Sequence, residues 1–386
     1  MMSEAKKRVP ERRFKEFLNA DEWEQRKFKD IAFKRGKISE EDLPYVEFED
    51  INSGIGTFNK NILQKVGHKK GILFEPGDVL FGKLRPYLQN WVLCQFRGIA
   101  VGDFWVLQPQ NVSPAFLYFL IQSEAYQSVA NISSGTKMPR SSWSLVSETQ
   151  FSIPKYNEAN MIGEFFSSID KNITLHQRKL DKLQATKKAL LQEMFPEEGQ
   201  DKPKRRFKGF TDAWEQRKVN DIFKITRGQV LATSLTTPKK TSQNIYPVYS
   251  SQTKNNGLMG YYSEYLFENA ITWTTDGANA GTVNFRPGRF YSTNVNGVLI
   301  NENGYACYAV SEIINKVAYK YVSKVGNPKL MNNVMAEIDI MITANIDELG
   351  RISKLIEEYN KLITLHQRKL DKLKNLKQAY LNEIFV

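Results

Sequence analysis

The sequence predicts a mixed α+β fold, in which two similar globular domains are separated by two long, antiparallel, coiled-coil-like helices in a pseudo-two-fold arrangement. Three observations lead to this prediction. The chain contains an internal repeat, each copy of the repeat has the apolar pattern of a long helix, and the stretch before each copy mixes strand-like and helix-like runs. A chain of 386 residues also suits two domains better than one.

The internal repeat is the strongest feature of the chain. Residues 173–183 read ITLHQRKLDKL, and residues 363–373 read the same letters at an offset of 190. A second pair of matches opens each half. These matches are 12–15 with 205–208 (RRFK) and 23–27 with 214–218 (WEQRK). The polar stretch 196–203, PEEGQDKP, has a Gly between two prolines and is typical of a linker. The two halves of the chain are therefore two copies of one structural repeat.

Each repeated segment is expected to form a long helix. Apolar residues recur at alternating spacings of four and three, which is the heptad seam of a coiled coil. The residues expected to pair the two helices are Ile169, Ile173, His176, Leu180, Leu183 and Leu190 with Tyr359, Ile363, His366, Leu370, Leu373 and Tyr380. A helix over 162–195 would be about 50 Å long. The histidines are interpreted as tolerated seam residues rather than metal ligands, because no further ligand types lie nearby.

The outer faces of these helices are basic, with Arg178, Lys179 and Lys182 in the first copy and Arg368, Lys369 and Lys372 in the second. A solvated helix face explains such charges without any partner. A surface that docks partner helices is the alternative. The identity of every letter in the repeat favours docking, because a spacer needs only the apolar pattern.

The composition limits the class of protein. Lys and Arg number 54 against 42 Asp and Glu, which gives a net charge of +12 and favours a polyanionic partner such as nucleic acid. The presence of only two cysteines and three histidines argues against a disulfide framework and a structural zinc site. No apolar run is long enough for a membrane span, and the charged start does not resemble a signal peptide. We expect a cytoplasmic protein with no metal and no membrane contact.

The two variable stretches, 24–157 and 215–345, indicate α/β globules. Strand-like runs include 71–74, 79–81, 104–107, 270–273 and 297–300, and helical runs include 114–128 and 305–325. Two loops in each half combine Gly with Ser, Thr or Asn and with Arg or Lys. The loops are GKLRPY and SSGTKMPRSSW in the first half, and TTDGANAGT and NPKLMNN in the second.

These loops are the candidate DNA-contacting sites. Arg and Lys suit guanine O6 and N7, Asn suits adenine, and Thr suits phosphate or a thymine methyl group. Ordinary turn composition also explains any single residue, but four loops at matching points favour DNA contact. The candidate residues are Lys83, Arg85, Tyr87, Ser134, Gly135, Thr136, Lys137, Arg140, Ser141, Trp143, Thr274, Thr275, Asp276, Gly277, Asn279, Arg286, Asn294, Lys329, Asn332 and Asn333.

With these motifs in view, the chain resembles the specificity subunits of type I restriction-modification systems. The two copies of ITLHQRKLDKL, the paired WEQRK segments, GKLRPYL, SSGTKMPRSSW, DGANAGTV and KLMNN carry the resemblance, which covers essentially the whole chain. It implies target-recognition domains at 1–157 and 205–345, conserved spacer helices at 158–195 and 346–386, and a linker at 196–204.

The resemblance also implies a function and partners. Such a subunit reads a split, bipartite site on double-stranded DNA and directs two copies of a methyltransferase (modification) subunit and the motor-nuclease (restriction) subunits to it, in defence against foreign DNA. The chain itself would be non-catalytic and would bind no cofactor. The partner subunits would use S-adenosylmethionine, ATP and Mg.

The sequence lacks the motifs of those partner activities. It contains no GxxxxGK[ST] phosphate loop, and Asn327-Pro328-Lys329 lacks the second proline and the aromatic residue of a methyltransferase motif. Two alternatives stay open at this point. One is a stand-alone two-module DNA-binding protein such as a repressor, and the other is an enzyme that acts alone.

Overall fold

The computed structural model describes residues 9–132, 138–251 and 254–385. It divides into two compact units. Unit 1 consists of Met1–Arg178 and Gln367–Val386, and unit 2 consists of Lys179–His366. The boundaries between the units fall inside two long helices, α4 (Tyr156–Met194) and α8 (Ile346–Ile384), which have 39 residues each. Each unit therefore contains one globular domain together with part of both long helices.

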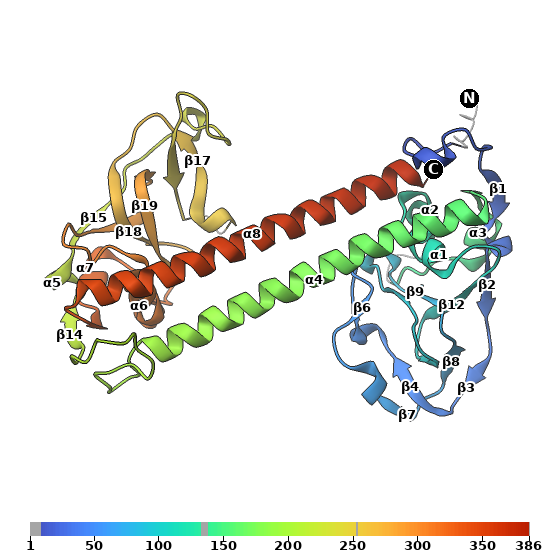
Figure 1. The fold of residues 1–386 in the computed structure, drawn as a ribbon, viewed down its shortest axis with the longest axis horizontal. Coiled ribbons are helices and arrows are strands. Elements are labelled where there is room, and N and C mark those ends of the chain that lie inside the picture. Colours follow the sequence, from blue (N-terminus) through green and yellow to red (C-terminus); the bar gives the residue numbers. More distant parts are fainter. Residues whose placement is uncertain (1–8, 133–137, 252–253, 386) are drawn as a thin grey trace. The chain divides into compact units, whose positions relative to one another are not determined.

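Unit 1 is built on two sheets (Figure 1). One has four strands in the order β10-β9-β12-β2, and the other has five in the order β3-β8-β11-β4-β7. Their bounds are β2 (Ala32–Arg35), β3 (Ile38–Ser39), β4 (Asp42–Val46), β7 (Val66–His68), β8 (Gly71–Phe74), β9 (Val79–Gly82), β10 (Trp91–Leu93), β11 (Gly98–Ala100) and β12 (Phe104–Pro109). A short hairpin pairs β5 (Ile51–Asn52) with β6 (Thr57–Phe58). The predicted strands at 71–74, 79–81 and 104–107 are confirmed.

Three short helices complete the domain of unit 1. They are α1 (Pro114–Leu120), α2 (Glu124–Ala130) and α3 (Trp143–Glu148). The predicted helix over 114–128 is thus two helices, because Ser123 caps the start of α2 through a bond from the Tyr126 backbone N–H. Helix α1 packs against α4 (Figure 1), where the rings of Phe119 and Phe166 lie 5.1 Å apart. Gly163 permits this approach, since a Cβ there would lie 2.8 Å from the Phe116 backbone nitrogen.

Unit 2 has one six-stranded sheet in the order β15-β20-β18-β19-β16-β17. The strands are β15 (Lys224–Arg227), β16 (Tyr246–Tyr249), β17 (Leu258–Tyr262), β18 (Phe267–Thr274), β19 (Val283–Ser292) and β20 (Asn296–Ile300). The helices are α5 (Val219–Ile222), α6 (Tyr308–Ala318) and α7 (Asn332–Ala336). The strands predicted at 270–273 and 297–300 are confirmed. The helix predicted over 305–325 ends at Ala318, since the chain beyond it forms a 3₁₀ turn and a hairpin.

The repeated WEQRK segments have the same structure in both units. Residues Glu24–Lys27 form β1, which pairs antiparallel with β13 (Gln150–Ile153). Residues Glu215–Lys218 form β14, which pairs antiparallel with β21 (Asp339–Ile342). In both units the tryptophan before the strand is 2% exposed. Each match therefore closes its domain by pairing the start of the domain with the strand that precedes the long helix.

The predicted heptad seam follows the buried side of both long helices. Every seam residue is buried or half-buried, and Leu180 and Leu370 are 3% and 1% exposed. In unit 1, the ring of Phe165 on α4 lies 5.3 Å from that of Tyr380 on α8. In unit 2, the equivalent residues Leu355 and Leu190 line one small space between the same helices.

These contacts make the helices antiparallel within each unit. In unit 1, Phe165 faces Tyr380, and Asp170, further along α4, meets Lys377, which comes earlier on α8. The mixed α+β class and the pairing of two long helices are confirmed. Among the residues that the structure describes, no helix combines the length and apolar character needed to cross a membrane.

Candidate nucleic-acid interface

In unit 1 the structure brings the two predicted loops together. The loop after β9 and the segment before α3 form an isolated β-bridge between Leu84 and Arg140. The Arg85 backbone N–H donates to the Pro139 carbonyl at 2.8 Å, and the Ser141 N–H donates to the Lys83 carbonyl at 2.9 Å. The predicted residues Ser134, Gly135, Thr136 and Lys137 lie outside the described residues.

A group of cations surrounds this loop pair. Lys83 and Arg140 share the carboxylate of Asp103, at 3.4 Å and 3.0 Å. Burial opposes ionisation of Asp103, but the hydrogen bond from Arg140 and the charge of Lys83 outweigh it and lower the pKa of the carboxyl group. Two cations therefore meet one anion at the base of the loops, which leaves positive charge to attract a polyanion.

Lys34 belongs to the same group, although no sequence motif marked it. Its Nζ lies 4.8 Å from the centre of the Trp143 ring. Burial, and then the charge of nearby Lys83, lowers the pKa of Lys34. A lysine on β2 carries no local sign of function, because it becomes a neighbour of Lys83 only through the pairing of β2 with β12. Only the fold places Lys34 beside the loops.

The other predicted residues of unit 1 differ in accessibility. Arg85 is exposed and has a positive φ of 49°, and Tyr87 is 57% exposed. Ser141 is 6% exposed, and its hydroxyl donates to the Ala130 carbonyl at 2.6 Å. Trp143 is half-buried and packs edge-on against Trp105. Arg85 and Tyr87 are thus presented to solvent, whereas Ser141 and Trp143 hold the loop to the domain.

Unit 2 pairs its two predicted loops in a related way. Asp276 and Lys329 form an isolated β-bridge. The Gly277 N–H donates to the Pro328 carbonyl and the Leu330 N–H to the Thr275 carbonyl, both at 2.9 Å. Lys329 Nζ lies 3.9 Å from the carboxylate of Asp276. Both units therefore hold a loop that follows an internal strand of a sheet against a second loop that carries a cation, Arg140 in unit 1 and Lys329 in unit 2.

Several side chains of this loop pair face solvent. Lys329, Asn294 and Asn333 are exposed, and Asp276, Asn279 and Asn332 are half-buried. Thr274 is 8% exposed, and Thr275 is fully buried with its hydroxyl donating to the Val295 carbonyl at 2.9 Å. Gly277 has a φ of +88°, which favours glycine at this turn. The exposed amides and Lys329 are the groups that a DNA surface can reach directly.

Arg286 lies inside unit 2 rather than on its surface. The residue is 7% exposed, its Nε donates to the Thr272 hydroxyl at 3.0 Å, and its guanidinium lies 3.8 Å from the centre of the Tyr249 ring. Burial lowers the pKa of Arg286 to about 10, although Tyr249 acts in the opposite direction. Contact with DNA through this side chain requires it to leave these partners.

The long helices carry a second set of matched contacts. Lys377 on α8 binds Asp170 at 2.8 Å and the Gln122 amide oxygen at 2.9 Å. Lys187, its counterpart on α4, binds Glu312 at 2.6 Å. Glu312 and Gln122 are also separated by 190 positions. A lysine of one long helix is therefore an anchor between that helix and a domain in both units.

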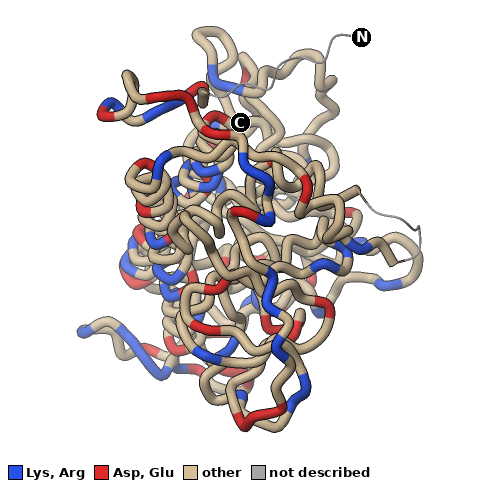
Figure 2. Tube along the Cα trace, turned by 90° about the vertical axis from the view of Figure 1, so that its right-hand side faces the viewer, with Lys and Arg blue, Asp and Glu red and all other residues tan. Residues whose placement is uncertain are grey.

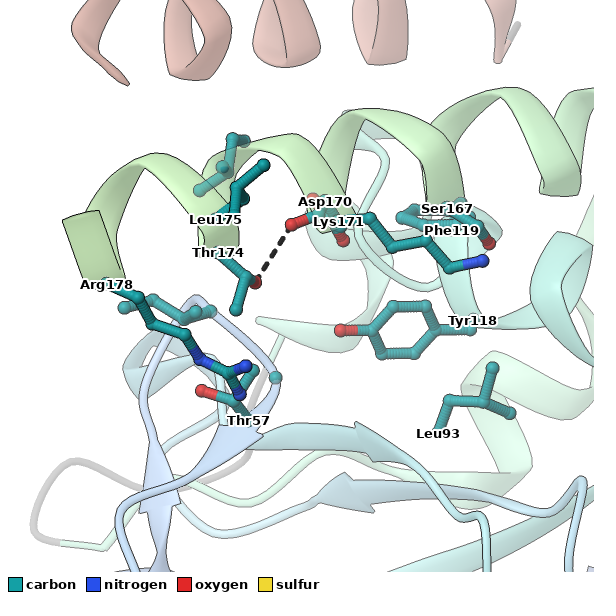
Figure 3. Close-up of a pocket in the computed structure, with 13 residues that line it drawn as sticks. Thr57, Leu93, Tyr118, Phe119, Ser167, Asp170, Lys171, Thr174, Leu175 and Arg178 are labelled. Carbon is teal, nitrogen blue, oxygen red and sulfur yellow. Dashed lines mark hydrogen bonds between the residues drawn. The ribbon is translucent and has the colours of Figure 1, made fainter. Parts of the chain in front are cut away.

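A pocket of about 450 Å³ lies beside α4 in unit 1. Figure 3 shows the Tyr118 ring extending into the space beneath the helix, with Arg178 reaching from α4 toward Thr57. The exposed Lys171 and Arg178 lie at this pocket together with Leu175, which is 47% exposed. The walls are mainly apolar, which distinguishes this pocket from the cationic loops.

In the parts of the chain that the structure describes, no group of three or more His, Cys, Asp or Glu side chains is close enough to hold a metal ion. Along the chain, the positions of Lys and Arg are interspersed with those of Asp and Glu (Figure 2).

Both halves of the chain match one family model, that of the type I restriction modification DNA specificity domain. The matched residues are 20–185 and 211–375. The two matches cover most of the chain, and each includes one domain and one copy of ITLHQRKLDKL.

Individual relatives agree with the family model. A Mycoplasma pneumoniae protein named as the N-terminus of a type I specificity subunit is 38% identical over 130 residues, which are 33% of this chain and 68% of that protein. The specificity subunit of the type I restriction enzyme MpnII from the same species is 34% identical over 139 residues, 35% of this chain and 41% of that subunit. The chain thus spans less than half the length of this second relative.

A solved structure shares the fold over nearly the whole chain. It is the crystal structure of the S subunit of a type I restriction-modification system from M. genitalium, with a TM-score of 0.70 and 14% sequence identity. The match covers 98% of this chain and 99% of that one. At this identity, the likeness shows a common architecture of two domains and two long helices.

Proposed function

The chain belongs to the type I restriction modification DNA specificity family, and as a specificity subunit it is non-catalytic; from this premise we propose that its two units read the two halves of one split DNA site. The loop pair at Leu84 and Arg140 in unit 1 contacts one half-site. The loop pair at Asp276 and Lys329 in unit 2 contacts the other. The repeated placement of two bridged loops that carry a Lys or Arg beside an Asp is the observation that carries this proposal.

The residues of the loops suit the two kinds of contact that a DNA-reading protein makes, which are contacts to phosphates and contacts to base edges. Lys83, Arg140 and Lys329 supply positive charge for phosphates or a fork of donors for guanine O6 and N7. The exposed Asn294 and Asn333 carry amides that match the N6 and N7 edge of adenine. Because the two loop pairs differ in sequence, we infer that the two half-sites also differ in sequence.

Helices α4 and α8 set the distance between the half-sites in this proposal. Matched contacts support it, since Phe165 with Tyr380 in unit 1 correspond to Leu355 with Leu190 in unit 2. A helix pair that is fixed to a domain at each end resists bending better than a single helix. The gap between the half-sites is then a property of the helix length.

The outer faces of the same helices dock the methyltransferase subunits. Leu175 and Leu365, which occupy the same position in the repeat, are 47% and 46% exposed. Each exposed leucine lies among the cations of its copy, such as Arg178 and Arg368. An exposed apolar side chain with cations in the same repeated segment, present twice at an offset of 190, suits two copies of one partner. Restriction subunits join this complex, and the partners supply S-adenosylmethionine, ATP and Mg.

Mapping of methylated bases in cells tests the proposal. Genomic DNA from cells that carry the gene is compared with DNA from cells in which it is deleted. We expect a methylated motif of two short defined segments separated by a fixed number of undefined bases, and we expect the motif to vanish in the deletion. An unchanged methylation pattern, as a stand-alone repressor would give, or a continuous motif would contradict the split-site proposal.

A further inference from the structure

The two most exposed large apolar side chains of unit 2 lie on loops and not on the sheet. Val325 is 90% exposed and Val230 is 78% exposed, more than any other large apolar residue in the described parts of the chain. A domain with a sizeable core has no need to place branched aliphatic side chains so far into solvent. Isolated exposed apolar residues are ordinary on protein surfaces. The exposure of these two residues therefore indicates a function only if they lie at the proposed binding surface.

Backbone hydrogen bonds tie both valine loops to the loop pair at Asp276 and Lys329. On the Val325 side, Ser323 and Lys329 exchange backbone hydrogen bonds of 2.8 Å and 3.2 Å, which close a hairpin around Val325. Gly326 has a φ of +72°, a conformation that suits glycine beside the tip. The same hairpin is fixed to the other loop through the bond from Gly277 to Pro328.

The Val230 loop reaches the same group through the turn at 292–296. The Gln229 N–H donates to the Ser292 carbonyl at 3.0 Å, and the Gly228 N–H donates to the Asn296 carbonyl at 3.1 Å. The Thr275 N–H then donates to the Val295 carbonyl at 3.1 Å. A Cβ on Gly228 would lie 2.1 Å from the Ser292 carbonyl oxygen, so the close approach of these loops requires glycine.

Polar and cationic residues surround the two valines. Lys324 and Gln229, their immediate neighbours in sequence, are exposed, as are Arg227, Lys329 and Asn294. Lys329 lies 3.9 Å from Asp276, and no ion pair is found for Arg227 or Lys324 among the residues that the structure describes. Apolar tips within a cationic, hydrogen-bonding surface suit the major groove, where each thymine presents an apolar C5-methyl group between polar base edges.

We propose that Val230 and Val325 read thymine by packing against its C5-methyl group in the half-site bound by unit 2. The inference rests on the proposed function and adds a chemical identity to the bases read. Cytosine and uracil lack this methyl group, so a valine contact favours thymine without a hydrogen bond. Neighbouring cations hold the phosphates, and the exposed amides read the adjacent base edges.

The experiment uses the full chain assembled with its methyltransferase subunit and a randomised DNA duplex library. Selection gives the preferred motif of the wild type, and each thymine of that motif is then replaced in turn by uracil. For at least one position, we expect uracil to weaken wild-type binding about 4-fold, the factor that corresponds to one buried methyl group. The Val325→Ala and Val230→Ala variants should lose this difference at their own positions, whereas Val325→Ile should keep it.

Val66→Ala is the matched control, because Val66 is 47% exposed on β7 and belongs to unit 1 rather than unit 2. It should retain the wild-type thymine preference at every position. A motif without thymine on either strand of one half-site, or alanine variants that keep the full preference for thymine over uracil, would overturn the inference and leave the proposed function intact. A wild-type complex that selects no motif at all would instead contradict the proposed function.

Discussion

Arg13 and Glu158 form a two-point ion pair inside unit 1, with Nε of Arg13 2.7 Å from Oε1 of Glu158 and Nη2 2.8 Å from Oε2. The side chains are 5% and 3% exposed. Arg206 and Glu348 repeat this pair in unit 2 at 2.6 Å and 2.8 Å. Both carboxylates lie in the first turn of a long helix. Each RRFK segment is thus fixed to the start of the helix that follows its own domain.

The preceding arginine of each segment reaches the other helix. The Arg12 backbone N–H donates to the Glu383 carbonyl near the end of α8, and the Arg205 N–H donates to the Glu193 carbonyl near the end of α4. Arg12 and Arg205 also form ion pairs with the side chains of Glu383 and Glu193. One pair of adjacent arginines therefore fastens the start of one long helix to the end of the other within each unit.

Loss of the buried carboxylate should destabilise each unit. Glu158→Gln or Glu348→Gln leaves a buried guanidinium without its charge partner, and we expect the free energy of unfolding to fall by about 3 kcal/mol. Urea unfolding, followed by tryptophan fluorescence, measures the change. Glu148→Gln is the control, because Glu148 forms only exposed pairs with Lys27 and Lys29. An equal loss of stability in the control would contradict the role assigned to the buried pairs.

Seam and outer-face leucines should give different defects. Leu180→Asp and Leu370→Asp put a charge at positions that are 3% and 1% exposed, so both helix pairing and partner assembly should fail while the domains stay folded. Leu175→Asp and Leu365→Asp change exposed positions, so the melting temperature should hold while retention of the methyltransferase subunit falls. Calorimetry and co-purification separate the two effects. Normal complex formation by the seam variants would show that assembly with the partner subunits does not depend on pairing of the two helices.

Removal of the carboxylate between Lys83 and Arg140 should strengthen nonspecific DNA binding. Asp103→Asn frees both cations, and we expect higher affinity for unrelated duplex DNA and a steeper dependence on salt.

Lys329→Ala should act in the opposite direction in unit 2. It should weaken binding by about 1 to 3 kcal/mol if Lys329 reaches a base, or reduce the salt slope by about one if it reaches a phosphate. If neither variant changes the affinity for DNA or its dependence on salt concentration, DNA does not bind at these two loop pairs.

The stability of unit 1 should depend on pH through Asp170. Burial raises the pKa of Asp170, although Lys377 acts in the opposite direction. The native state therefore binds more protons than the unfolded state between the unfolded and the folded pKa, and stability falls as the pH rises through this window. Asp170→Asn, which copies Asn360 at the equivalent position of α8, should lack this slope. If the free energy of unfolding varies with pH in the same way for the wild type and for Asp170→Asn, Asp170 is not the source of the pH dependence.

The sequence predicted those parts of the fold that depend on local pattern. The heptad spacing placed Leu180 and Leu370 correctly on the buried side, and the short apolar runs at 71–74 and 297–300 are strands because their residues pack on both faces of a sheet. The two loops of each domain were selected by composition. Their pairing at Leu84 with Arg140 and at Asp276 with Lys329 depends on contacts between distant segments, which no local pattern specifies.

Other features required the fold itself. Ser141 has the same loop composition as its neighbours, yet its hydroxyl is turned inward to the Ala130 carbonyl. Arg286 looked like a groove-reading arginine, but its place on β19 directs it onto Tyr249. Lys34 was missed because its neighbour Lys83 is 49 positions away in sequence. The DNA contacts of the loop residues and the domain limits predicted from the sequence stay predictions.

The spacing of the half-sites tests the central claim most directly. Duplicating 176–182 in α4 and 366–372 in α8 adds one heptad to each helix, keeps the seam in phase and every proposed docking residue in place, and lengthens the pair by about 10.5 Å. That length corresponds to about three base pairs at 3.4 Å each. Methylation mapping should then find both half-sites unchanged and the gap between them longer by about three base pairs. A duplication variant that still methylates DNA at the original gap would contradict the account.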